Sequence, residues 1–147
     1  MKSAQYSSSA VLSYPSIAKS RGTIRRHYLA WRLQQHIPER CDDPRCRYHN
    51  DPLTWNRSPL PLILDHISGN TKDNTPQNLR LLCPNCESQL ETRGGHNVGR
   101  IHNEPAGGYQ VKHRNGRVDA HAFPGGVKMT ASVASVRAHV TADEDDA

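Results

Sequence analysis

Aromatic side chains are scarce in this sequence. They make up 5% of its 147 residues, and hydrophobic residues of all kinds make up 35%. A chain of this length and composition forms one small domain with a thin hydrophobic core. Such domains are commonly stabilised by a bound metal or by disulfides. The sequence therefore predicts a single small domain held together by a cross-link of this kind.

Long apolar segments are also missing. No run approaches the roughly 20 residues that span a bilayer, so we expect no membrane partner. Residues 1–14 are rich in serine and contain no continuous apolar stretch, which argues against a secretory signal. We therefore expect a cytoplasmic protein in a reducing environment, where disulfides are rare.

Cysteine is limited to four residues in two pairs, Cys41 with Cys46 and Cys83 with Cys86. Thiolates separated by two to four residues can point into one tetrahedral shell. In a reducing compartment this spacing favours one structural Zn²⁺ over two disulfides. His49 is an alternative ligand, although four thiolates already complete the shell.

Acidic side chains are few outside the C-terminal end, which holds Asp143, Glu144, Asp145 and Asp146. The formal net charge is +5 for the whole chain. Without those four acids, 19 Lys and Arg side chains face 10 Asp and Glu, a net charge of +9. This balance suits a polyanionic partner such as DNA, although an ordinary solvated basic surface would look the same.

A helix is predicted over residues 24–36, with Thr23 as its N-cap. Ile24, Tyr28 and Trp31 recur at i, i+4 and i+7, which places them on one apolar face. The arginines of this segment lie off that face. They form either a solvated basic surface or a set of phosphate contacts, and the two interpretations are compatible.

Two strands and a second helix are predicted in the middle of the chain. Residues 60–64 form a short strand that delivers Asp65 and His66 at its end. Residues 79–82 form a second strand, antiparallel to the first. Pro84 then suits the first turn of a helix that extends to about Thr92 and stops at glycines.

The C-terminal third has one strong local signal. Asn115-Gly116 lies between two alternating segments, 109–114 and 117–123, which predicts a hairpin with a two-residue turn. In that register Lys112 lies opposite Asp119. Residues 127–133 alternate as a third strand would, although a helix over 133–140 remains an alternative. We divide the chain into a flexible or loosely docked arm (1–18), a main domain (19–99), a linker (100–108), a small β appendage (109–141) and an acidic disordered tail (142–147).

The segment from residue 60 to residue 95 combines Asp65-His66, Gly69-Asn70, Asp73-Asn74 and Asn78-Leu79 with the flanking cysteine pairs. In these residues it resembles the zinc-containing form of the HNH (His-Asn-His) endonuclease family, over roughly residues 24–97. The resemblance implies a small α+β fold with a ββα-metal (His-Me finger) core and a structural zinc site of four cysteines. The C-terminal β-hairpin or meander would be added to that core.

The resemblance also implies a mechanism, the hydrolysis of phosphodiester bonds in DNA. His66 is the candidate general base, because an imidazole titrates near neutral pH. Asp65 points to the opposite side of the strand and would bind a divalent cation that stabilises the leaving 3′ oxygen. By the same resemblance, Asn78 braces the loop and helps to orient His66.

One position departs from the family pattern. The family usually places its last histidine directly after the second cysteine of the second pair, where this sequence has Glu87. By resemblance, Glu87 is the second protein ligand of the catalytic cation. An Asp and Glu pair offers only oxygen and suits Mg²⁺ or Mn²⁺. Two alternatives remain: Glu87 is a surface residue of a weakened or inactive enzyme, or His96 supplies the missing imidazole.

The basic residues expected to contact nucleic acid are Arg21, Arg25, Arg26, Arg32, Lys72 and Arg80. The C-terminal hairpin can add DNA contacts, pack on the core or mediate a homodimer.

Three functions compete. The first is a metal-dependent HNH endonuclease of bacterial or phage character. The second is a zinc-stabilised DNA-binding module with lost or weakened catalysis. The third, an interaction protein built on a zinc ribbon, leaves Asp65, His66 and Asn78 unexplained.

Overall fold

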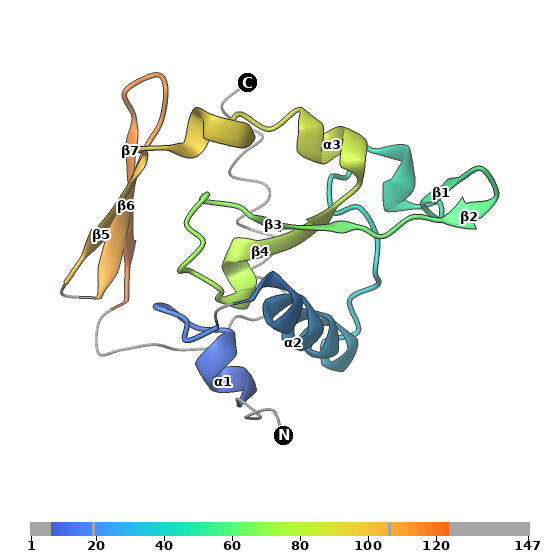
Figure 1. Ribbon diagram of the computed structural model, residues 1–147, viewed down its shortest axis with the longest axis horizontal. Helices are drawn as coiled ribbons and strands as arrows, with labels where there is room; N and C mark the ends of the chain where they lie inside the picture. Colours follow the sequence, from blue (N-terminus) through green and yellow to red (C-terminus); the bar gives the residue numbers. More distant parts are fainter. Residues whose placement is uncertain (1–6, 19, 106, 124–147) are drawn as a thin grey trace.

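A pair of antiparallel strands, β3 (Ile63–His66) and β4 (Leu79–Leu82), lies at the centre of the computed structural model (Figure 1). The structure describes residues 7–18, 20–105 and 107–123. Asp65 pairs with Arg80 and His66 with Leu79, so the expected antiparallel pairing is confirmed. Because successive side chains in a strand point to opposite faces, Asp65 and His66 face opposite sides of the pair.

Helix α2 (Arg21–Gln34) covers one face of the strand pair. Ile24, Tyr28 and Trp31 are all buried, as their helical spacing predicted, and they pack in one core cluster with leucines of β3 and β4. The predicted N-cap was wrong. The helix begins earlier, with Ser20 as its N-cap and the Ser20 hydroxyl accepting a hydrogen bond from the Thr23 N–H at 3.1 Å.

The N-terminal segment contributes to the core, so the prediction of a flexible or loosely docked arm was wrong for residues 7–18. Helix α1 (Ser8–Val11) leads into Val11 and Leu12, which are fully buried in the same cluster as α2. The backbone N–H of Ser16 donates to Lys72 O at 3.0 Å, and the Asn74 N–H donates to Ser13 O at 3.0 Å. These bonds attach the segment to the loop between β3 and β4.

Short elements complete the central region. The 3₁₀ turn η1 (Arg47–His49) follows the first cysteine pair, and β1 (Thr54–Trp55) and β2 (Ser58–Pro59) form a small hairpin. The 3₁₀ turn η2 (Pro76–Asn78) precedes β4. Helix α3 (Pro84–Ser88) begins at Pro84 as predicted but is shorter than expected, and the 3₁₀ turn η3 (Gly94–Asn97) follows it.

Three strands form the C-terminal sheet in the order β5 (Ile101–Glu104), β6 (Gly108–Lys112) and β7 (Val118–Ala122). The predicted linker over residues 100–108 therefore contains a strand. In Figure 1 this sheet and the β1–β2 hairpin lie at opposite ends of the molecule, with β3 and β4 between them. The described part of the chain is thus a small mixed α/β fold.

The predicted hairpin register was wrong by one residue. Lys112 pairs with Val118, and Asp119 pairs with Val111. The turn contains three residues, Arg114 to Gly116: the Gly116 N–H donates to His113 O at 3.0 Å, and Gly116 has a φ of 87°. Three-residue hairpin loops place a glycine at this left-handed position, which shifts the pairing relative to a two-residue turn.

The strand or helix expected within residues 127–140 and the acidic tail at 142–147 lie outside the described residues. None of the helices in the described residues has the length and hydrophobicity needed to cross a bilayer.

Candidate metal centre and active site

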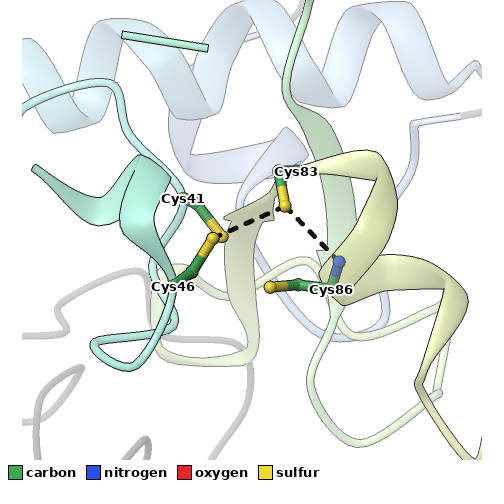
Figure 2. Close-up of side chains that lie close together, drawn as sticks. All are labelled: Cys41, Cys46, Cys83 and Cys86. Carbon is green, nitrogen blue, oxygen red and sulfur yellow. Dashed lines mark hydrogen bonds between the residues drawn. The ribbon is translucent and has the colours of Figure 1, made fainter. Parts of the chain in front are cut away.

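The four cysteines converge on one point (Figure 2). Their Sγ atoms all lie within 4.8 Å of one another, and Cys46 Sγ is 3.7 Å from Cys83 Sγ. A tetrahedron of zinc–sulfur bonds of about 2.3 Å separates its sulfurs by about 3.8 Å. All four cysteines are free, so the cluster is not a pair of disulfides. The residues present therefore fit Zn²⁺.

Local backbone structure presents these sulfurs. Cys83 is the N-cap of α3, and its Sγ accepts a hydrogen bond from the Cys86 N–H at 3.4 Å. Cys46 Sγ accepts one from the Tyr48 N–H, also at 3.4 Å. Burial raises the pKa of the Cys41 thiol to about 11, so a nearby cation is needed to hold it as a thiolate at neutral pH. His49 is engaged elsewhere, with Nδ1 2.8 Å from Cys41 O.

A buried ion pair attaches the first cysteine pair to the core. Arg32 is 2% exposed, and its guanidinium donates two hydrogen bonds to Asp42, at 2.7 and 3.0 Å. Asp42 Oδ2 also accepts from the Leu81 N–H of β4 at 2.7 Å. The prediction that Arg32 contacts nucleic acid was therefore wrong, because its guanidinium is buried against Asp42.

The loop between β3 and β4 is braced from within by Asn78, which is 2% exposed. Its side-chain oxygen accepts from the Ser68 N–H at 2.9 Å, and its amide nitrogen donates to Asp73 O at 2.9 Å. One side chain thus connects both sides of the loop. Whether Asn78 also orients His66 during catalysis stays a prediction.

His66 lies on the α2 side of the strand pair and is 7% exposed. Its Nε2 is 2.6 Å from Asn74 Oδ1. Burial lowers the pKa of His66 below its usual value, although the contact with Asn74 opposes that shift. The imidazole is therefore neutral at pH 7, which is the state that a general base requires.

Asp65 lies on the opposite face and accepts a hydrogen bond from Arg80 Nε at 2.7 Å. Burial raises the pKa of Asp65, and the charge of Arg80 opposes this shift. Glu87 is half-buried in the first turn of α3. Within the described ranges, the four cysteines form the only group of three or more His, Cys, Asp or Glu close enough to hold a metal. The structure therefore gathers the sulfur ligands, and Asp65 and Glu87 belong to no such group in the described residues.

The remaining predicted nucleic-acid contacts have different environments. Arg21 and Arg25 of α2 donate to the backbone oxygens of Leu64 and Leu62, the latter at 2.5 Å. Arg80 is paired with Asp65. Arg26 and Lys72 are exposed. The exposed side chains of Arg26 and Lys72 are available to bind phosphate. The paired arginines already use some of their N–H donors in hydrogen bonds to the protein.

Sequence reasoning missed a group of polar side chains, from the N-terminal segment and the C-terminal sheet, that form a hydrogen-bonded network with the loop after His66. Tyr109 donates to Asp73 and lies 3.0 Å from Ser68 Oγ. Asn103 Oδ1 accepts from Asn70 at 2.9 Å and from the Tyr14 hydroxyl at 2.9 Å. Partners up to 89 residues apart meet here, and no local pattern signals such contacts.

A comparison with curated proteins supports the HNH family. The chain is 47% identical over 47 residues to H-N-H endonuclease F-TflIV of Escherichia phage T5. The match covers 32% of this chain, and the chain spans about a fifth (21%) of the length of that relative. No family model matches the sequence, and no solved structure matches it.

Proposed function

We propose that this chain is a metal-dependent DNA endonuclease of the HNH type. The observation that carries the proposal is the arrangement at the end of β3. There a carboxylate and a neutral imidazole occupy adjacent positions, beside a helix whose start bears two cysteines of the candidate zinc site. The partial match to a phage endonuclease supports the same activity class.

In the proposed reaction, His66 accepts a proton from the water that attacks the phosphorus. Its Nε2 donates to Asn74 Oδ1 when the proton is on that nitrogen, so Nδ1 is the atom that accepts. Asp65 and Glu87 would hold Mg²⁺ or Mn²⁺, which neutralises charge on the phosphate and the leaving 3′ oxygen. Mg²⁺ usually keeps several waters and takes only one or two protein carboxylates, so a third protein ligand is not required.

The zinc would be structural. Four thiolates leave no open position for water. Zn²⁺ on Cys41, Cys46, Cys83 and Cys86 would connect the first cysteine pair to the start of α3 and so fix the helix that carries Glu87.

A second function is a zinc-stabilised DNA-binding module without catalysis. Two observations favour it: His66 is 7% exposed, and Asp65 is already paired with Arg80. In the nuclease, the Asp65 carboxylate would have to bind both the Arg80 guanidinium and a divalent cation. In the binding module, it would bind Arg80 alone.

Nicking of supercoiled plasmid in Mg²⁺ or Mn²⁺ separates the two functions. We expect the wild type to convert plasmid to open circles and His66→Ala to lose at least 100-fold in rate, about the low end of the contribution of a general base. His102→Ala is a matched control, because His102 is exposed on β5. Equal residual cleavage by the wild type and His66→Ala would remove the nuclease function and leave the binding module.

A further inference from the structure

A groove with a volume of about 420 Å³ lies beside β4 and α3. One wall comes from β4, α3 and the segment between Cys41 and Cys46, and the other comes from Arg100 and the turn between β6 and β7. Charged side chains dominate the lining, whereas small-molecule pockets are mostly apolar. The groove therefore suits an ionic and extended ligand.

Five arginines line this groove: Arg45, Arg80, Arg100, Arg114 and Arg117. Its three lining acids are already engaged. Asp42 is paired with the buried Arg32, Asp43 with Arg45, and Glu91 with Arg100. A guanidinium has five N–H donors in a planar fork, so an arginine with one carboxylate partner can still bind a phosphate. The ligand best matched by the remaining donors is an anion.

The turn between β6 and β7 provides two exposed arginines, Arg114 and Arg117. Arg114 is exposed, and its Nη2 lies 2.6 Å from His96 Nδ1. No carboxylate in the described residues pairs with it. Arg117 lies at the other end of the same turn, where it contacts Asp119 at 3.3 Å. The three-residue turn places both arginines on the groove lining.

Arg100 belongs to the same wall and is held by hydrogen bonds to the protein. It is 9% exposed, and its Nε donates to Lys112 O at 2.9 Å. Its Nη2 donates to Glu91 at 2.8 Å, while its buried Nη1 has no partner within the described structure. An unpaired buried donor is unfavourable, so an acceptor oxygen of a ligand at Arg100 Nη1 would be stabilising.

The groove reaches the proposed active site, because Arg80 belongs to its lining and is hydrogen bonded to Asp65. A strand whose cleaved phosphate lies at Asp65 would continue past Arg80 toward the β6–β7 turn. We propose that this groove binds the phosphodiester backbone of DNA on one side of the cleaved bond, with Arg114 and Arg117 contacting phosphates. This inference rests on the proposed function for the position of the cleaved bond.

Fluorescence anisotropy with a labelled DNA duplex, in the zinc-loaded full chain and without added Mg²⁺, tests the groove apart from cleavage. For Arg114→Gln with Arg117→Gln we expect about a 10-fold loss of affinity. The slope of log K against log salt should become shallower by about 2, one for each lost phosphate contact. Arg57→Gln is the matched control, because Arg57 is exposed in the β1–β2 turn at the far end of the molecule (Figure 1).

Each outcome decides the groove independently of the nuclease. Equal affinity and salt slope in the double variant and the wild type would overturn the proposal that the groove binds DNA. A wild type that does not bind DNA would overturn it as well. A loss as large in Arg57→Gln would also overturn it, since the effect would then be general charge. A wild type that binds through these arginines but cannot nick plasmid would keep the groove and remove the nuclease.

Discussion

The hydroxyl of Tyr109 in β6 donates a hydrogen bond to Asp73 in the loop that follows His66. Tyr109 is 1% exposed and Asp73 is 2% exposed, so this bond is made away from solvent. It joins the C-terminal sheet to the loop that carries Asn78 and Asn74. The sheet is therefore a second support for the candidate active site and is not a separate appendage.

Tyr109→Phe should reveal that support. Removing the hydroxyl leaves the buried Asp73 short of one donor, which costs about 1 to 3 kcal/mol. We expect chemical denaturation to show this loss, and plasmid nicking to show a lower kcat with little change in KM. Tyr48→Phe is the control, because no hydrogen bond of the Tyr48 hydroxyl is seen among the described residues. Equal stability of the two variants would show that the Tyr109 bond contributes nothing.

Removal of zinc should unfold the domain. Structural zinc contributes about 10 to 16 kcal/mol of folding free energy in small zinc-binding peptides. The net stability of a whole domain is only about 5 to 15 kcal/mol, so loss of the zinc contribution is enough to unfold it. We expect chelation, or Cys83→Ser, to abolish the cooperative thermal transition measured by circular dichroism. Metal analysis should give one zinc per wild-type chain. An unchanged melting temperature in Cys83→Ser would contradict a structural zinc.

Arg32 and Arg26 lie on the same helix and should respond differently to substitution. Arg32→Met removes the ion partner of the part-buried Asp42, which keeps the Leu81 N–H, so the cost should lie below about 3 to 5 kcal/mol, the cost of breaking a fully buried pair. Arg26 is exposed, so Arg26→Met should change stability little. If Arg26 contacts phosphate, that variant lowers DNA affinity at moderate salt. Denaturation and anisotropy measure the two effects, and a stable Arg32→Met protein would argue against the ion pair.

Alkaline pH should destabilise the fold through Tyr28. Burial raises its pKa to about 12, although the charge of Arg32 opposes the shift. Because folding favours the neutral phenol, this contribution is complete below about pH 10 and is lost as pH rises through about 12. Two pKa units correspond to about 3 kcal/mol. Between about pH 8 and about pH 11, the free energy of unfolding measured by denaturation should therefore fall less in Tyr28→Phe than in the wild type. Identical pH profiles in the two proteins would contradict a contribution from Tyr28.

Glu87→His introduces the residue usual in the HNH family, which this chain resembles, and tests the proposed second ligand. An imidazole is a softer ligand than a carboxylate, so we expect cleavage to shift from Mg²⁺ toward Mn²⁺, Co²⁺ or Ni²⁺. Ser88→Ala, on the exposed side of the same helix, is the control. A metal preference that is the same in all three proteins would mean that Glu87 does not bind the catalytic cation.

The amino-acid sequence by itself determined the features whose signals are local. Alternation predicted a strand leading to Asp65 and His66, although β3 lies three residues later than expected. The apolar run at residues 79–82 predicted β4, helical spacing predicted the buried face of α2, and cysteine spacing predicted one cluster of four sulfurs. The strands and the helix depend on residues a few positions apart, where backbone periodicity decides which side chains share a face, and each cysteine pair has ligand spacing of its own. The partial match to a phage HNH endonuclease agrees with the family that these residues suggested.

Tertiary structure alone decided the rest. It buried Val11 and Leu12 of a serine-rich segment, paired Arg32 with Asp42, and placed His66 against Asn74. It also brought Tyr14 to Asn103 and Tyr109 to Asp73, across 89 and 36 residues. Whether a polar side chain meets solvent, substrate or another side chain depends on which distant elements pack over it, and periodicity within one segment carries no information about that packing.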